Sequence, residues 1–329
     1  MGTATVIIYD RQRGLLLKES TVVAVNTKTG KVIAVGDEAN IMVGRTPEYI
    51  QVIKPLSDGV ISNFEMTNIM IEYFIKKVNI GSFIKPRVII CVPSGITEVE
   101  ANAVVRAASG AGARKVYLIE EPVAAALGAG LDISKPNGQM ILDIGGGTSD
   151  AAVMSFNGVV CKASVRVAGR KIDDAIAKYL RCEYKLIIGV RTAEQIKIAI
   201  GTAFFDGDES TFEVKGRDSQ TGMPKKITVQ RSNLCTAISE TIDAIVGVVR
   251  QVLEVTPPEL SSDLKSNGLV LTGGGALLHG LDKRISYETS LSVRVANNPD
   301  ECVAKGTVMA FDLVDSLVDG LVNRAIRTF

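Results

Sequence analysis

One stretch constrains the fold more than any other: residues 140–150 read Met-Ile-Leu-Asp-Ile-Gly-Gly-Gly-Thr-Ser-Asp. The apolar run predicts a buried strand and the glycines a tight turn, after which residues 151–156 predict a second strand closed by an Asn157-Gly158 hairpin turn. Glycines let backbone N–H groups approach a bulky anion, as in phosphate-binding nests. Beside such an anion, Asp143 suits a magnesium ion or its water shell, and Thr148 suits a hydrogen bond to a phosphate or a water. Three adjacent glycines are equally compatible with a β-turn that binds nothing.

Composition excludes several classes of protein. The chain has 329 residues, enough for two domains, and its 37 Lys+Arg balance 36 Asp+Glu, which gives no electrostatic case for binding nucleic acid. Its five cysteines are scattered without a CxxC pair and it has a single histidine, so a disulfide framework or structural zinc is not expected, and a reducing cytoplasm fits best. No apolar run reaches the ~18 residues of a membrane span, and no signal peptide follows Met1, so any membrane contact is expected to be peripheral.

The beginning of the chain has the same order of features as the end of the glycine stretch, a glycine and hydroxyl turn followed by a strand. Residues 2–5 (Gly-Thr-Ala-Thr) lead directly into an apolar strand at residues 6–9, followed by a polar turn at residues 10–14. Two glycine and hydroxyl turns, each opening a hairpin, predict two halves of similar design that face a shared phosphate. The second turn follows a strand ending in Asp143, whereas nothing stands before the first.

Further segments each have a functional and a purely structural interpretation. Glu121 opens a helix of alanines and glycines, where it either caps the helix electrostatically or faces a ligand as a base. Thr192 and Gln195 have the spacing of a capping box at the start of another helix. On that helix, Glu194 and Lys197 would ordinarily form a solvated salt bridge. Residues 273–275 predict a second triple-glycine turn that opens a helix. His279 is expected within that helix, as a surface or packing residue.

The loop at residues 80–86 carries Phe83 and Ile84 beside a lysine. The residues alone favour burial of both side chains under the next strand over insertion of the loop tip into a membrane.

In order along the chain, five segments resemble the five nucleotide-site segments of the ATPase superfamily of actin, sugar kinases and heat-shock chaperones: Gly2-Thr3, Glu121-Pro122, residues 143–148, residues 273–275 and residues 303–307. The sequence resembles one branch most closely, the MreB family of bacterial actins. The motifs that carry this resemblance are residues 119–122 (IEEP), 143–148 (DIGGGT), 191–197 (RTAEQIK) and 271–278 (LTGGGALL). Each motif is weak alone, but their order and spacing over essentially the whole chain are specific.

The resemblance implies ATP and Mg²⁺ as ligands and a role for each matching residue. Glu121 is expected to orient the attacking water, Thr148 to assist it, and Asp143 to lie near the magnesium, through water. Phe83 and Ile84 fall where the family carries a membrane-insertion loop, which reverses the interpretation above. The other nucleotide contacts are expected at Gly2, Thr3, Ala4 and Thr5 (first phosphate loop), Gly145, Gly146, Gly147 and Thr148 (second phosphate loop), Glu194, Gln195, Ile196 and Lys197 (ribose, through Glu194 and Lys197), and Gly274, Gly275, Ala276 and Leu277 (adenine).

The implied fold is α/β and actin-like, with two α/β domains, a small subdomain on each, and the nucleotide in the cleft between them. The expected boundaries are residues 1–21, 65–131 and 307–329 for domain IA, 22–64 for subdomain IB, 132–170 and 235–306 for domain IIA, and 171–234 for subdomain IIB.

The implied function is that of a filament-forming ATPase that hydrolyses ATP slowly and guides cell-wall synthesis and rod shape. Its expected partners are further copies of itself in paired protofilaments, the inner face of the cytoplasmic membrane, and membrane proteins of the cell-wall elongation machinery. The rivals are a small-molecule kinase or a chaperone-type ATPase of the same fold, for which the chain offers little room, and an assembly protein that does not hydrolyse ATP.

The sequence departs from the family pattern at its beginning. The family has a strand ending in Asp before the first Gly-Thr, and here Met1 takes the place of the residue after that Asp, so we expect the native protein to begin upstream. Thr5 stands where the family usually has Asn, and Asp150 where Glu is common; modest effects are expected of both.

Overall fold

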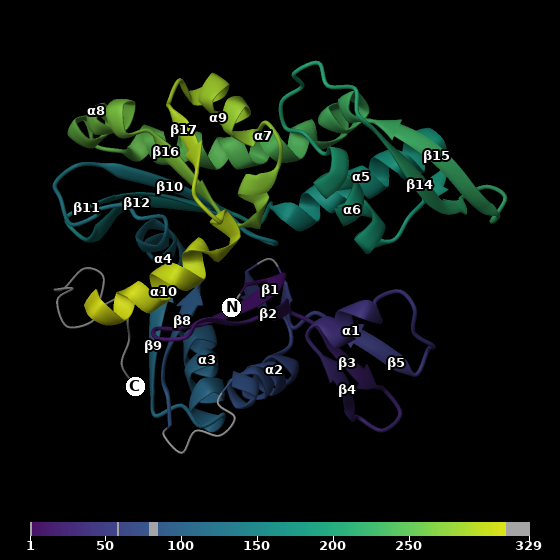
Figure 1. The fold of residues 1–329 in the computed structure, drawn as a ribbon, viewed down its shortest axis with the longest axis horizontal. Coiled ribbons are helices and arrows are strands. Elements are labelled where there is room, and N and C mark those ends of the chain that lie inside the picture. The colour runs from purple at the N-terminus through teal and green to yellow at the C-terminus, as the bar shows by residue number, and fades with distance from the viewer. Residues whose placement is uncertain (1, 58, 79–84, 314–329) are drawn as a thin grey trace. The chain divides into compact units, whose positions relative to one another are not determined.

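The computed structural model describes residues 2–57, 59–78 and 85–313 of the chain (Figure 1). The chain folds into two compact units. Unit 1 comprises residues 1–137, 154–160 and 301–329, and unit 2 comprises residues 138–153 and 161–300. Each unit combines sheets with covering helices, as an α/β fold predicts.

Two pairs of strands and four helices form the larger part of unit 1. The antiparallel pair is β1 (Thr5–Asp10) with β2 (Gly14–Ser20), and the parallel pair is β8 (Arg87–Val92) with β9 (Lys115–Glu120). The helices are α2 (Phe64–Val78), α3 (Glu98–Gly110), α4 (Glu121–Gly128) and α10 (Cys302–Leu313). The N-terminus of α3 carries a capping box, in which Thr97 and Glu100 bond reciprocally through side chain and backbone.

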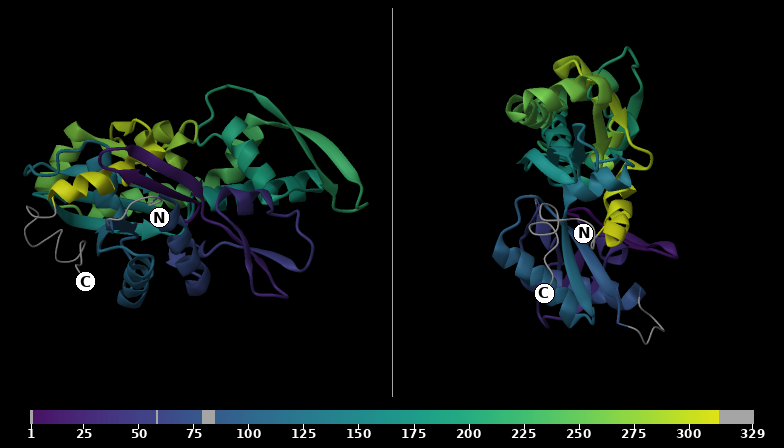
Figure 2. Two further views of the ribbon diagram at one scale, coloured as in Figure 1. Left: turned by 60° about the horizontal axis from the view of Figure 1, so that its bottom comes forward. Right: turned by 90° about the vertical axis from the view of Figure 1, so that its left-hand side faces the viewer.

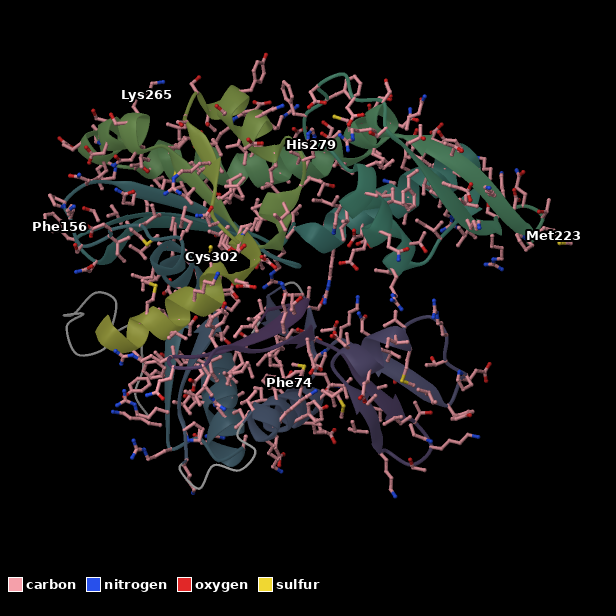
Figure 3. The ribbon with its side chains drawn as sticks, in the orientation of Figure 1. Phe74, Phe156, Met223, Lys265, His279 and Cys302 are labelled. Carbon is pink, nitrogen blue, oxygen red and sulfur yellow. The ribbon has the colours of Figure 1, made fainter. Side chains whose placement is uncertain are left out.

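A small sheet with one short helix forms the rest of unit 1. Its strand order is β4 (Val32–Val35), β3 (Val23–Asn26) and β5 (Ile50–Ile53), with α1 (Asp37–Ile41) beside it. Two short antiparallel strands, β6 (Leu56–Ser57) and β7 (Val60–Ile61), lead from this sheet to α2. The core then spreads over two faces of α2, since Met70 and Phe74 pack with residues of β1 and β3 while Ile71 and Ile75 pack with α3 and β9 (Figure 3).

Helices α4 and α10 cross with almost no space between their backbones. A Cβ added at Gly128 would lie 1.8 Å from the carbonyl oxygen of Cys302, and one added at Gly306 would lie 1.7 Å from that of Ala124. Both distances are far below van der Waals contact, so the crossing requires glycine at both positions. The small residues of α4 therefore serve close helix packing, and their partner is α10 of the same unit.

Unit 2 is built on a five-stranded sheet. Its order is β12 (Gly158–Val165), β11 (Ser149–Ser155), β10 (Gln139–Ile144), β16 (Leu269–Thr272) and β17 (Val293–Val295). β10 runs parallel to β16 with Met140 opposite Leu269. Every residue of β11 and all but the first of β10 are buried, which explains why both strands lack the polar alternation of a half-exposed sheet.

Helices and a second small sheet complete unit 2. The helices are α5 (Gly169–Tyr184), α6 (Val190–Ile200), α7 (Arg231–Val255), α8 (Pro258–Asn267) and α9 (Leu281–Thr289), with single 3₁₀ turns at η1 (Gly274–Leu277) and η2 (Pro299–Glu301). The small sheet pairs β13 (Leu186–Ile187), β14 (Thr211–Asp218) and β15 (Pro224–Gln230), and the β14–β15 hairpin extends beyond α5 and α6 to an exposed turn at Met223 (Figures 2 and 3).

Within the described residues, α7 has the length and apolarity that a membrane span requires. Its apolar residues at Leu234, Ile238, Ile242, Ile245 and Val249 are buried in the main core of unit 2. They recur every three to four residues and so form one face of the helix. This spacing is that of a core helix.

Candidate functional site

The glycine stretch folds as predicted, into a tight turn between two buried strands. β10 ends at Ile144, β11 begins at Ser149, and the Gly145 N–H donates to the Thr148 carbonyl oxygen at 2.9 Å. The start of α5 holds this turn from outside: the Gly169 N–H donates to the Gly145 carbonyl at 3.2 Å, and the Arg170 N–H to that of Gly146 at 2.9 Å. The turn is therefore fixed to the N-terminus of α5, and its two glycine carbonyls satisfy the first two backbone N–H groups of that helix.

Residues 2–5 of unit 1 form the same turn. The Gly2 N–H donates to the Thr5 carbonyl oxygen at 3.0 Å, and β1 begins at Thr5. The Thr21 hydroxyl donates to the Gly2 carbonyl at 2.8 Å and so ties the turn to the segment that follows β2. The two glycine and hydroxyl turns thus share one hydrogen-bond pattern, which supports the prediction of two halves of similar design.

Asp143 is a buried carboxylate at the end of β10. It accepts a hydrogen bond of 2.9 Å from the Thr272 hydroxyl, and Asp150 lies close enough to act on its charge. Burial, and to a smaller extent the charge of Asp150, raises the pKa of Asp143 to about 7 against the opposing effect of Thr272. Two neighbouring buried carboxylates are the hard oxygen ligands that Mg²⁺ prefers, and a cation would relieve their repulsion. These residues therefore fit the expected magnesium.

The expected ribose segment lies on α6, and its residues have different surroundings. Glu194 and Gln195 are exposed, whereas Ile196 is buried in the core. Lys197 is mostly buried, and its ammonium lies 2.8 Å from the Asp173 carboxylate and donates to the Gly169 carbonyl at 3.2 Å. Sequence reasoning missed Asp173, although it occupies a buried position beside Ile172 in the apolar stripe of α5. The Thr192–Gln195 capping prediction is wrong, because α6 begins at Val190 after Gly189 and has no side-chain cap.

The second triple-glycine turn packs against the end of β10. A Cβ added at Gly273 would lie 2.3 Å from the Ile144 carbonyl oxygen, and one at Gly275 would lie 2.2 Å from the Ile144 side chain. This close approach brings Gly274–Leu277, the expected adenine segment, next to the strand that carries Asp143. The segment is a 3₁₀ turn instead of the predicted start of a helix, and Leu277 is 63% exposed.

His279 corrects another detail of the prediction. It lies between η1 and α9 instead of within a helix, with its Nδ1 3.0 Å from the Thr202 hydroxyl and its Nε2 3.5 Å from the Asp206 carboxylate (Figure 3). These contacts fit a surface packing residue.

Glu121 and the expected membrane residues complete the predicted set. Glu121 is the first residue of α4, directly after β9, and is 9% exposed. This position suits both a helix-capping role and a ligand-facing role, because it lies at the carboxyl end of a parallel strand. Phe83 and Ile84 lie outside the described residues.

Comparison with known proteins identifies the family. The profile of the family described as MreB/Mbl protein matches residues 1–319. The cell shape-determining protein Mbl of Bacillus subtilis is 48% identical over 318 residues, which cover 96% of this chain and 96% of Mbl. The cell shape-determining protein MreB of Escherichia coli is 46% identical over 321 residues, covering 96% and 92% of the two chains.

Solved structures agree with the sequence comparison. MreB5 of Spiroplasma citri bound to ADP superposes with a TM-score of 0.91 at 36% identity, covering 95% of this chain and 94% of MreB5. A chain of the MamK double helical filament, 20% identical with a TM-score of 0.81, shows the same fold. The actin-like fold that the motifs imply is thereby confirmed. The chain belongs to the MreB/Mbl family, the bacterial actins that determine cell shape.

Proposed function

We propose that this chain binds ATP with Mg²⁺, polymerises into filaments, and hydrolyses ATP slowly within them, and that the filaments lie on the cytoplasmic membrane. The observation that carries the proposal is the shared turn of Gly2–Thr5 and Gly145–Thr148, each with its glycine N–H bonded three residues ahead. Support comes from Spiroplasma citri MreB5, which has been solved with ADP and with AMPPNP at 36% identity to this chain.

Each predicted residue has a chemical role in this proposal. The two glycine turns offer backbone N–H groups to phosphate oxygens, and Glu121 orients the attacking water, assisted by Thr148. Asp143 holds the hydrated magnesium, which when bound neutralises phosphate charge. Hydrolysis is slow because a carboxylate only positions water and no residue serves as a dedicated nucleophile. Gly274–Leu277 flanks the adenine and the α6 segment contacts the ribose.

The finer organisation is also part of the proposal. Within unit 1, residues 22–64 form subdomain IB and residues 1–21, 65–131 and 307–329 form domain IA. Subdomain IIB spans residues 171–234, and domain IIA residues 132–170 and 235–306. The partners are further copies of the chain in paired protofilaments, anionic lipid and membrane proteins of the elongation machinery.

Electron microscopy of the purified protein with Mg-ATP and anionic vesicles tests the proposal, with phosphate release measured on the same samples. We expect paired filaments lying on the lipid, and release that falls at least tenfold in Glu121→Gln without loss of filaments. Filaments without phosphate release would establish an assembly protein that does not hydrolyse ATP. Monomeric protein with rapid phosphate transfer to a small molecule would establish a kinase, and both outcomes would overturn the ATPase-filament proposal.

A further inference from the structure

Two exposed cations lie side by side where the parallel strands of unit 1 begin. Arg87 is the first residue of β8 and Lys115 the first of β9, and the two are partners in the register of this strand pair (Figure 1). Such partners leave the sheet on the same face. Like charges at paired positions of neighbouring strands destabilise a sheet, so the stability of the fold does not account for this arrangement.

Aromatic rings hold both cations in place. The Arg87 guanidinium lies 5.5 Å from the centre of the Phe311 ring. The Lys115 ammonium lies 5.0 Å from the centre of the Tyr117 ring. The two rings contact each other edge to face with their centres 6.3 Å apart, and Tyr117 is buried. Because a ring attracts the cation stacked on it, the two charges form one ordered pair, called here the cation pair.

The cation pair differs from the paired lysines nearby. At the end of α2, Lys76 forms an ion pair with Glu72 on the preceding turn of the same helix. Within the part of the chain that the structure describes, no carboxylate forms an ion pair with Arg87 or Lys115. Two ordered positive charges of this kind attract a negatively charged ligand from outside the chain.

The ligand that the cation pair suits is a phosphate. An arginine guanidinium donates two parallel N–H groups to phosphate oxygens, and a lysine ammonium adds a compact charge. Because the pair carries two positive charges, a phosphate with two negative charges gains more from it than a phosphate with one. A diffuse patch of cations would respond only to the total charge of its partner.

The sequence places the cation pair close to the segment that is expected to contact lipid. Phe83 and Ile84 come shortly before Arg87. The Pro86 carbonyl accepts a hydrogen bond of 2.8 Å from the Arg114 N–H, so the chain that leaves this segment is joined to the start of β9. A headgroup contact at the cation pair is therefore compatible with insertion of the two apolar side chains by the same subunit.

We propose that Arg87 and Lys115 form a headgroup site for anionic phospholipid, and that this site prefers a headgroup whose phosphate carries two negative charges. The ligand class is a phosphomonoester lipid, of which phosphatidic acid is the simplest. The inference rests on the proposed membrane association and adds a selective contact to it, because insertion of Phe83 and Ile84 would not depend on the headgroup.

Vesicle flotation of filaments formed with Mg-ATP tests the site. The vesicles are phosphatidylcholine with either phosphatidic acid or phosphatidylglycerol, at matched zeta potential. We expect wild type to bind the phosphatidic acid vesicles about fivefold more tightly. Arg87→Gln/Lys115→Gln should bind both kinds of vesicle equally, and the exchange Arg87→Lys/Lys115→Arg should keep most of the preference because it keeps both charges.

The matched control is Lys28→Gln/Lys31→Gln. It also removes two exposed cations from unit 1, and Lys28 is likewise stacked on a ring, 5.4 Å from the centre of that of Tyr49. This control should keep the full preference for phosphatidic acid. Glycerol 3-phosphate should not displace wild type from either kind of vesicle.

Three outcomes overturn the inference while leaving membrane association in place. The first is equal binding of wild type to the two kinds of vesicle, which would mean a diffuse attraction to charge. The second is a preference that survives in Arg87→Gln/Lys115→Gln. The third is displacement by glycerol 3-phosphate, which would make the ligand a soluble phosphate ester. Wild type that floats with neither kind of vesicle would overturn the proposed membrane association as well.

Discussion

The charge of the Asp143 carboxylate has two opposed effects: it destabilises the fold, and it serves the proposed binding of the metal ion. Its pKa is raised to about 7 by burial and by Asp150, so its ionisation at pH 8 costs stability. Asp143→Asn removes the charge and keeps an oxygen for the Thr272 hydroxyl. We expect calorimetry at pH 8 to show a nucleotide-free variant that is more stable by about 1–3 kcal/mol, with no further stabilisation by Mg²⁺ in the presence of ADP.

Thr272→Val is the matched control for this prediction. It keeps the charge on Asp143 and removes the 2.9 Å hydrogen bond that favours the ionised form, so stability at pH 8 should fall. If Asp143→Asn were less stable than wild type, the carboxylate would be serving the fold, and its assignment to the ion would be contradicted.

Asp173 predicts a specific dependence of stability on pH. Its folded pKa of about 6 exceeds the ordinary value of 3.8, so between these values the folded state keeps a proton that the unfolded state has released. The free energy of unfolding therefore falls as pH rises through this window and levels off above it. The free energy of unfolding of wild type minus that of Asp173→Asn, measured with urea, should fall by at most about 3 kcal/mol from pH 4 to pH 6.5. The contribution of Asp143 to the pH dependence is the same in both proteins and cancels in this difference. A difference that stays constant with pH would contradict the assignment of the raised pKa to Asp173.

Residues within one local pattern were predictable, and residues joined by tertiary contact were not. Asp143 and Thr148 flank a glycine turn whose strand, turn and strand all lie within one short stretch, so the turn follows from the sequence alone. Asp173 sits in the apolar stripe of α5, and its partner Lys197 comes from another helix. Only the packing of α5 on α6 brings the two together, although a carboxylate on an apolar face was a signal for a buried partner.

At the scale of elements, the α4–α10 crossing depends on glycine. Gly306→Ala places a Cβ 1.7 Å from the Ala124 carbonyl oxygen, and the two helices must separate to admit it. We expect a loss of about 2–4 kcal/mol in the free energy of unfolding, as for overpacked core sites, measured by urea denaturation. Gly247→Ala in α7 is the matched control, because nothing lies within 4 Å of its added Cβ, and it should be stabilising by about 0.5–1 kcal/mol. Equal effects of the two substitutions would show that helix propensity, and not the crossing, decides stability.

Elements with a strong local period were predicted well, and short or glycine-led elements were not. The apolar residues after Asn63 recur at helical spacing and lie in α2, and Thr97 and Glu100 have the spacing of a capping box and begin α3. The segment after Gly273 forms a 3₁₀ turn instead of an α-helix. Gly273, which has a φ of +79°, and Gly275 both pack closely against Ile144, and periodicity does not reveal such tertiary packing.

At the scale of the whole molecule, the two units share a local design that the sequence indicates before any fold is known. Each has a glycine N–H bonded to the carbonyl three residues ahead, followed by a strand and a hairpin. The division into two units crosses β11, whose residues 149–153 belong to unit 2 and whose last two belong to unit 1. Composition does not mark that boundary, because both sides of it are buried strand, and the four-part division stays a prediction.

The proposed attachment to the membrane belongs to the assembled filament, and the sequence of residues 80–86 predicts how it arises. Phe83 and Ile84 precede Lys85, which is exposed, so two apolar side chains adjoin a charge that attracts anionic lipid. Burying each apolar side chain contributes about 1.5–3 kcal/mol, and a filament presents many copies of this segment.

The variant Phe83→Ala/Ile84→Ala should therefore form filaments with Mg-ATP but lose at least tenfold in cosedimentation with anionic vesicles. Val99→Ala, which trims an exposed apolar residue of α3, should bind vesicles as wild type does. Lys85→Ala should weaken binding only at low salt, because screening removes the contribution of a single exposed charge. Undiminished binding by the double variant would place the lipid contact elsewhere on the filament, since loss of two inserted side chains from every subunit cannot leave the affinity unchanged.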